Sequence, residues 1–250
     1  KLEVSKIFAK QLMDELGIAT ARFRVAEDKR RARELALQMG FPVVLKADGL
    51  AAGKGVAVVE TRAELDATLE RLPSGRFVVE EKLTGEEVSF IVYVNGQRVL
   101  LLEPTQDHKP VYDGDRGPNT GGMGAYCDSR ILTPAQRQEI MDRIVLPVLA
   151  GMKAKGTPYH GFLYAGLMMT ADGPKVLEFN VRLGDPEAQP LLYRMDSDFL
   201  AVLTDREPMR WSEHPSVCVV LAAEGYPARP RTGDPISGVE EAEACGAVVF

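Results

Sequence analysis

Apolar residues near the start of the chain recur at the spacing of a helix. Five of them between Val4 and Leu16 share one helical face, and Gly17 follows, as is common directly after a helix end. Residues 21–25 alternate between apolar and arginine positions, which indicates a half-buried strand, and residues 27–39 predict a second amphipathic helix. The chain therefore opens with a helix, a strand and a helix.

Short strands around a glycine-rich loop come next. We expect strands at 41–46, 56–59 and 77–83, and a helix that starts at Thr61 and reaches about residue 72. Glu64 lies three residues after Thr61, which is the spacing of a capping box. The pattern up to this point thus predicts a compact α+β unit of roughly 60 residues.

The rest of the chain alternates hairpins with helices. Asn95-Gly96 is a strong hairpin signal, and polar stretches as long as 105–126 are usually functional or disordered. In chain order we expect strands at 88–94 and 97–102, a loop at 105–126, a helix from Thr133 to just before Gly156, strands at 161–170 and 175–182, a helix after Pro186, and a strand at 217–223.

Composition and charge narrow the class of protein. Of the 250 residues, 45% are hydrophobic and 26% are charged, as in ordinary globular domains. The net charge is −6, which argues against nucleic acid as a partner because phosphate-backbone binders usually carry a basic surplus. The three scattered cysteines predict neither a disulfide framework nor a zinc site, and they favour a reducing cytoplasm.

Neither the length of the apolar runs nor the termini suggest a membrane protein. The longest apolar run, 217–223, is too short to cross a bilayer. Lys1 is not a start methionine and the apolar run 246–250 stops abruptly, so we expect a portion of a longer polypeptide. These features predict a cytoplasmic protein with no membrane or nucleic-acid partner.

The first candidate for chemistry is the glycine-rich segment 46–55. Its glycines allow a close backbone approach to phosphate oxygens, and Lys46 and Lys54 add positive charge. It is not a Walker A loop, because Gly55 stands where that motif has Ser or Thr and a strand follows. A flexible hairpin tip is the competing interpretation, but Lys46 ends an apolar strand and must find an anion or solvent there.

The second candidate is the end of the strand at 79–83 together with 85–87. The backbone of a strand that enters a linker can pair with the edge of an adenine, and a carboxylate nearby can accept from ribose hydroxyls. A solvated acidic strand end explains the same residues.

The third candidate is the strand at 175–182. A period of two puts Glu178, Asn180 and Arg182 on one face, where the two oxygen donors could bind magnesium and the guanidinium a phosphate or carboxylate. The polar side of an edge strand is the alternative. The fourth candidate, 113–124, is rich in glycine, Asp and Asn, which suits either a small polar substrate or a disordered linker.

In this order, the segments 44–55, 106–109, 113–126 and 178–187 resemble blocks of the ATP-grasp ligases, and among them of the phosphoribosylamine–glycine ligases, or glycinamide ribonucleotide synthetases, of purine biosynthesis. The resemblance covers essentially the whole chain, and 117–126 is its most specific piece. It implies an α+β ATP-grasp fold, with ATP between two α+β subdomains and the start of a C-terminal domain. The implied parts are a lead-in helix at 1–18, a lid at 19–82, a large subdomain at 83–214 and a truncated domain at 215–250.

The resemblance also assigns roles to residues. It implies catalytic roles for Lys46 and Arg182, and metal ligation of Mg²⁺ or Mn²⁺ by Glu178 and Asn180. For ATP it implies contacts from Lys46, Gly53, Lys54, Gly55, Val56, Glu80, Glu81, Lys82, Leu83 and Glu87. For the substrates it implies Asp115, Asn119, Thr120, Gly121, Gly122, Met123, Gly124, Arg182 and Asp185.

The implied reaction joins glycine to phosphoribosylamine through a glycyl phosphate formed with ATP, and a monomer is expected. The chain departs from many ATP-grasp enzymes at the metal site, because residues 162–169 contain no carboxylate. We therefore expect the metal to take further ligands from Asp185, Glu187, water or phosphate. Two alternatives stay open. The chain could be another ATP-grasp carboxylate–amine ligase, or a nucleotide-binding module without catalysis.

Overall fold

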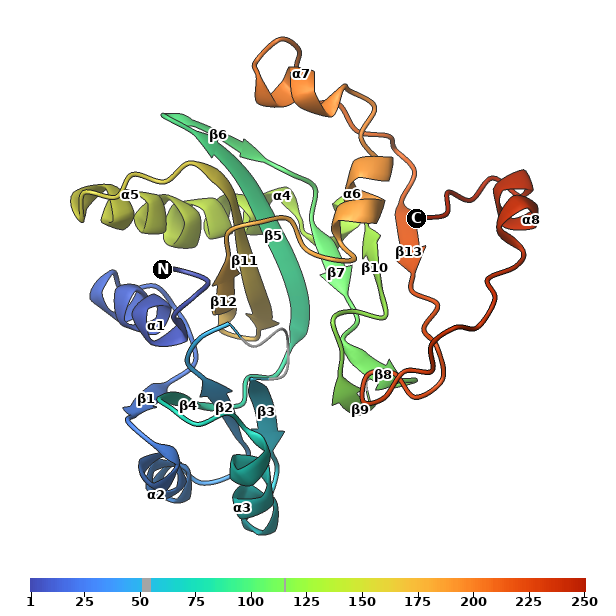
Figure 1. Cartoon of the computed structure of the whole chain (residues 1–250). Helices are drawn as coiled ribbons and strands as arrows, with labels where there is room; N and C mark the ends of the chain where they lie inside the picture. The colour runs from blue at the N-terminus through green and yellow to red at the C-terminus, as the bar shows by residue number, and fades with distance from the viewer. Residues whose placement is uncertain (51–54, 115) are drawn as a thin grey trace.

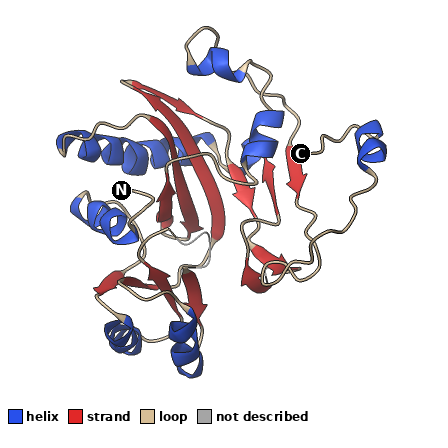
Figure 2. Cartoon of the chain, in the orientation of Figure 1, coloured by secondary structure: helices blue, strands red, loops and turns tan. Residues whose placement is uncertain are grey.

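The computed structural model describes residues 1–50, 55–114 and 116–250. These residues form two separate mixed layers of sheet and helix, a smaller and a larger one, and the α+β expectation is confirmed (Figures 1 and 2). The first helix, α1 (Lys6–Glu15), begins after Ser5, whose side chain accepts from the Phe8 amide as an N-cap.

The smaller layer is a four-stranded sheet in the order β1-β4-β2-β3. Helices α2 (Lys29–Met39) and α3 (Arg62–Arg71) pack on one face and enclose a core of small aliphatic residues and Phe77. Asp28 caps α2, whereas the Thr61 side chain bonds Glu64 instead of a backbone amide, so the predicted capping box is wrong. The strands are β1 (Phe23–Ala26), β2 (Val43–Ala47), β3 (Val56–Val59) and β4 (Phe77–Glu81).

The larger layer is a seven-stranded sheet in the order β12-β11-β5-β7-β10-β13, with β6 paired to β5. Its long central strands give it a strongly apolar face, which explains why helices cover that side (Figure 1). The strands are β5 (Glu86–Asn95), β6 (Arg98–Leu101), β7 (Thr105–Asp107), β10 (Gly124–Cys127), β11 (Gly161–Thr170), β12 (Gly173–Asn180) and β13 (Ser216–Val219).

The covering layer consists of α1 and one long interrupted helix. Thr133 and Gln136 form the predicted capping box of α4 (Pro134–Ile140), which continues through a π-helical turn (Met141–Val145) into α5 (Leu146–Ala154). Leu12 and Met13 of α1 are buried in the same core as Phe90 and Leu163 of the sheet. This packing places α1 between the larger sheet and the smaller one.

Several sequence-based boundaries are wrong. The stretch predicted as the loop 105–126 holds β7, β10 and a small hairpin of β8 (Pro110–Tyr112) and β9 (Arg116–Asn119). The strand expected at 175–182 ends at Asn180, and the one expected at 217–223 ends at Val219. Short strands with polar or glycine residues lack the apolar alternation on which a sequence prediction depends.

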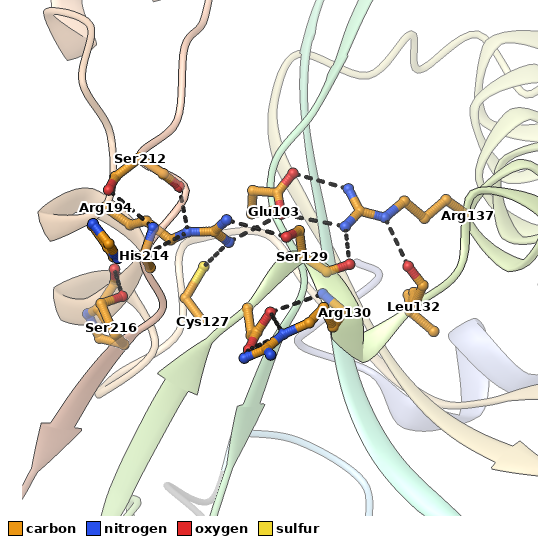
Figure 3. A network of polar contacts seen from close by, with 12 residues as sticks. Glu103, Cys127, Ser129, Arg130, Leu132, Arg137, Arg194, Ser212, His214 and Ser216 are labelled. Carbon is orange, nitrogen blue, oxygen red and sulfur yellow. Dashed lines mark hydrogen bonds and ion pairs between the residues drawn. The ribbon is translucent and has the colours of Figure 1, made fainter.

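A buried arginine network ties the C-terminal part of the chain to the sheet (Figure 3). Arg194 follows α6 (Ala188–Tyr193) and donates to Glu103, to the carbonyls of Ser212 and His214, and to Ser129. Arg137 of α4 holds the other oxygen of Glu103 at 2.9 Å. Beyond this network lie α7 (Phe199–Leu203) and α8 (Val239–Ala244). None of the described helices is long and apolar enough to span a membrane.

Candidate active site

A cavity of about 340 Å³ lies where α1, the smaller sheet and the edge strand β12 meet. Its walls carry residues from the end of β2 and the start of β3, from α1, and from the last residues of β12. They include Glu3, Lys6, Lys10, Lys46, Gly55, Val56, Glu178, Asn180 and Arg182. The first and third candidates from the sequence are therefore neighbours in space.

Lys46 is buried in β2, with a side chain only 7% exposed. Its ammonium forms an ion pair with Glu80 of β4 and donates to the Leu177 carbonyl at 3.0 Å. A lysine buried at the end of an apolar strand needs an anionic partner, and here that partner is Glu80. Because Lys46 also lines the cavity, the same ammonium can meet an anion that enters it.

A β-bulge supplies the carbonyl that accepts from Lys46. Between β11 and β12, Gly166 pairs with Glu178 and Leu167 pairs with Val176, so Leu177 is an extra residue. The bulge lies on the edge strand, where the smaller layer attaches: Thr20 donates to the Val176 carbonyl, and Val176 donates to the Ala19 carbonyl. Sequence alternation could not reveal this irregularity.

Glu178 and Asn180 line the cavity, and both side chains carry oxygen atoms that can bind a metal. Both are half-buried, and within the described ranges neither side chain has a hydrogen-bond or ion-pair partner. The described part of the chain contains no group of three His, Cys, Asp or Glu side chains placed to hold a metal. Two free hard donors fit a divalent ion that takes its remaining ligands from water and phosphate.

The sequence predicted that Arg182 continues the row of Glu178 and Asn180 along the strand. This is wrong, because β12 ends at Asn180 and Arg182 lies beyond it. Arg182 nevertheless lines the cavity. Its Nε atom lies 3.2 Å from Glu3 Oε1, and Nη1 donates to the Leu183 carbonyl. The side chain is 58% exposed.

Sequence reasoning missed the contribution of α1. Lys6 donates to the Gly49 carbonyl at 2.8 Å, and burial lowers its pKa. Lys10 is buried on the apolar stripe of α1, three residues from both Ile7 and Met13, and burial lowers its pKa to about 8 despite the opposing effect of Glu80. A lysine at a core position of an amphipathic helix was the available signal.

The predicted substrate segments also meet each other. Thr120 is buried, and its hydroxyl donates to the Lys109 carbonyl and accepts from the Gly122 amide. Gly122 packs so closely on the 182–187 turn that an added Cβ would lie 2.3 Å from Pro186 Cδ. Gly121 donates to the hydroxyl of Tyr226 from the C-terminal segment. This glycine-rich segment is thus docked against Asp185-Pro186.

Two carboxylates near this segment already have partners. Glu187 accepts from Tyr164 at 2.8 Å and from Ser89 at 3.2 Å, and burial raises its pKa. Glu187 is therefore poorly placed to bind a metal. Glu87 pairs with Lys109, whose pKa rises because Asp107, Glu87 and Glu178 outweigh the effect of burial.

The remaining predicted residues fall into three groups. Lys46, Gly55 and Val56 line the cavity, whereas Glu81, Lys82, Leu83 and Glu87 do not. Glu81 accepts from the Arg22 amide, and Lys82 pairs with Glu60. Asn119 is exposed, and Met123 and Gly124 pair with His108 through the backbone. Gly53, Lys54 and Asp115 lie outside the described residues.

Comparisons with known proteins identify the family of the chain. The model of the family "Phosphoribosylglycinamide synthetase, ATP-grasp (A) domain" matches residues 4–188. Phosphoribosylamine–glycine ligases of Allochromatium vinosum and Yersinia pestis are 50% and 46% identical to the chain over its whole length. The chain covers 62% of each of these relatives.

Solved structures share the fold. A crystal structure of phosphoribosylamine–glycine ligase from Thermotoga maritima is 38% identical and superposes with a TM-score of 0.82, covering 92% of this chain and 62% of that one. The ADP complex of N5-carboxyaminoimidazole ribonucleotide synthetase, at 16% identity and a TM-score of 0.69, shares the fold alone. The chain belongs to the phosphoribosylglycinamide synthetase family and carries its ATP-grasp domain.

Proposed function

We propose that the protein is an ATP-dependent ligase that joins glycine to 5-phosphoribosylamine and gives glycinamide ribonucleotide, ADP and phosphate. The observation that carries this proposal is the 50% identity to a phosphoribosylamine–glycine ligase over the whole chain. The chain spans 62% of the length of that relative, so activity and substrates are proposed for the protein to which the chain belongs. A monomeric state and a cytoplasmic location stay predictions.

The reaction needs an activated carboxylate, because oxide is a poor leaving group. A carboxylate oxygen of glycine attacks the γ-phosphorus of ATP, the bond to the β–γ bridging oxygen breaks, and ADP leaves. The amine of phosphoribosylamine then attacks the carbonyl carbon of glycyl phosphate. The carbon–oxygen bond to phosphate breaks, and the amine releases a proton. Positioning and neutralisation of charge supply most of the catalysis in such transfers.

The residues of the cavity divide these tasks in the proposal. The ammonium of Lys46 binds the phosphates of the nucleotide, and Lys6 adds positive charge on the α1 side. Arg182 has the planar donors to hold a carboxylate or a phosphate in two contacts. The small substrate is assigned to the segment around Gly121 and Gly122, whose amides donate to Tyr226 and Thr120 and would have to leave these partners to bind it.

Glu178 and Asn180 would hold Mg²⁺ or Mn²⁺ through their unpartnered oxygens. Such an ion, when bound, neutralises negative charge on the phosphates. Residues 81–83 and Glu87, from which adenine and ribose contacts are expected, do not line the cavity. The nucleotide would therefore extend beyond the cavity to reach them.

Phosphate release tests the proposal. The protein is incubated with ATP and Mg²⁺, and glycine and phosphoribosylamine are supplied together, singly or not at all. We expect phosphate release, with glycinamide ribonucleotide detected by mass spectrometry, only when both substrates are present. Equal release with other carboxylate–amine pairs would refute this substrate assignment while leaving an ATP-grasp ligase. Nucleotide binding without turnover, unchanged in Glu178→Ala, would instead support a binding module.

A further inference from the structure

A buried triad of alternating charges lies beside the cavity. Glu80 of β4 sits between two lysines: it pairs with Lys46 through Oε1, and its Oε2 lies 2.6 Å from the ammonium of Lys10. The side chains of Glu80 and Lys10 are each 2% exposed. The contact to Lys10 is an ion pair rather than an aligned hydrogen bond.

Lys10 is held in place from its other side. Its ammonium donates to the Thr20 hydroxyl at 2.6 Å, and that hydroxyl donates to the Val176 carbonyl of β12. The ammonium also lies 5.8 Å from the centre of the Phe23 ring. Lys10 is therefore fixed to α1, to β1 and to the larger sheet at once, and it cannot follow Lys46 if Lys46 moves.

The charges of the triad are unequal in number. Two ammonium groups face one carboxylate, so one positive charge is in excess, and it lies at the wall of the cavity. Lys46 can turn toward a bound anion only if Glu80 keeps a partner, because a buried carboxylate without one is strongly disfavoured. The other partner within the described structure is Lys10.

We propose that Lys10 is a positioning residue that neutralises Glu80 and thereby releases Lys46 to bind the phosphates of the nucleotide. The inference rests on the proposed function, since it takes the nucleotide to be the anion that Lys46 meets. Without Lys10, the carboxylate of Glu80 retains Lys46 and competes directly with the phosphates.

Protonation of Lys10 should then control nucleotide affinity. Burial lowers its pKa to about 8, although Glu80 and Glu81 oppose this effect and Lys46 adds to it. As the pH rises through about 8, Lys10 loses its charge, Glu80 depends on Lys46 alone, and the affinity falls. Lys10→Arg keeps the charge at all these pH values and removes that fall.

A double-mutant cycle tests the inference by calorimetric titration with Mg-ATP. We expect Lys10→Met to weaken ATP binding by about tenfold or more, because it removes one partner of a buried ion pair. In Lys10→Met with Glu80→Gln, no carboxylate retains Lys46, and the affinity should return to within about threefold of Glu80→Gln alone. Lys153→Met, an exposed lysine of α5, is the matched control and should change nothing.

The outcomes separate the claims. A double variant that binds about tenfold or more weakly than Glu80→Gln alone, or an unchanged Lys10→Met, overturns the positioning role while ATP binding stands. A wild-type protein that binds no ATP overturns the proposed function, and the positioning role with it. If Lys10→Met does not fold, the pH profile of the wild-type dissociation constant between pH 7 and 9 decides: a loss of affinity centred near the pKa of about 8 supports the role, and a flat profile overturns it.

Discussion

Arg182 keeps part of its guanidinium unoccupied at the mouth of the cavity. One edge contacts Glu3 and the Leu183 carbonyl, and more than half of the side chain is open to solvent. A guanidinium in this position can bind Glu3 and an incoming carboxylate or phosphate at the same time, because its donors are spread over a rigid plane. An ammonium has no such plane and would have to choose between them.

We therefore expect Arg182→Lys to lower kcat/KM for glycine by about tenfold or more, a loss of one charge-assisted hydrogen bond or more. Steady-state phosphate release at varied glycine concentration measures it. Arg143→Lys provides the control, since Arg143 is 72% exposed and pairs with Glu139 on a helix far along the chain from the cavity residues. Equal rates for Arg182→Lys and the wild type would remove Arg182 from the site.

At the scale of elements, Arg194 connects three parts of the chain that lie far apart in the sequence. It joins the end of α6 to Glu103, to the Ser129 region after β10 and to the segment before β13, all within one buried network (Figure 3). Its side chain is 3% exposed, and that of Glu103 is 12% exposed. Burial raises the pKa of Cys127 to about 11, although Arg194 opposes this shift, and the thiol therefore stays protonated.

Removal of this arginine should destabilise the fold. We expect Arg194→Met to lower the free energy of unfolding by about 3–5 kcal/mol, because it leaves Glu103 and several carbonyls without a partner. Arg130→Met is the control: Arg130 pairs with Asp128 but is 80% exposed, so its loss should lower the free energy of unfolding far less. Urea denaturation of both variants measures the difference. Equal losses would mean that the network around Arg194 contributes no special stability.

The sequence predicted some of these elements and missed others for physical reasons. Alternation in 175–182 correctly placed Glu178 and Asn180 together, because side chains alternate across any regular strand. It could not predict the extra residue Leu177, since a bulge depends on the partner strand. The strands within 105–126 were missed because they are held by neighbours rather than by an apolar face of their own.

The α1 helix shows the same limit at the residues that form the cavity. Its apolar spacing predicted a helix, and the structure shows that helix with Leu12 and Met13 buried in the core of the larger sheet. The sequence analysis gave its lysines no role, because lysines on amphipathic helices usually face solvent. Only the position of α1 between the two sheets brings Lys6 and Lys10 into the cavity wall.

For the whole molecule, the net charge of −6 is a sum over the chain and does not show where positive charge gathers. Lys6, Lys10 and Lys46 gather where the two sheets meet, while most acidic residues lie elsewhere. A sum over the chain is therefore an argument about nucleic acid as a partner and says nothing about a single nucleotide. The arrangement of a small sheet against the edge of a large one, with a cavity between, is what makes that local charge possible.

The central claim is that the carboxylate of glycine becomes an acyl phosphate before the amine attacks. Glycine labelled with ¹⁸O in both carboxylate oxygens distinguishes this route from direct hydrolysis of ATP. The protein is supplied with labelled glycine, ATP, Mg²⁺ and phosphoribosylamine, and the released phosphate is analysed by mass spectrometry. The account predicts one ¹⁸O atom in each phosphate, transferred from glycine. Unlabelled phosphate released alongside glycinamide ribonucleotide would contradict it.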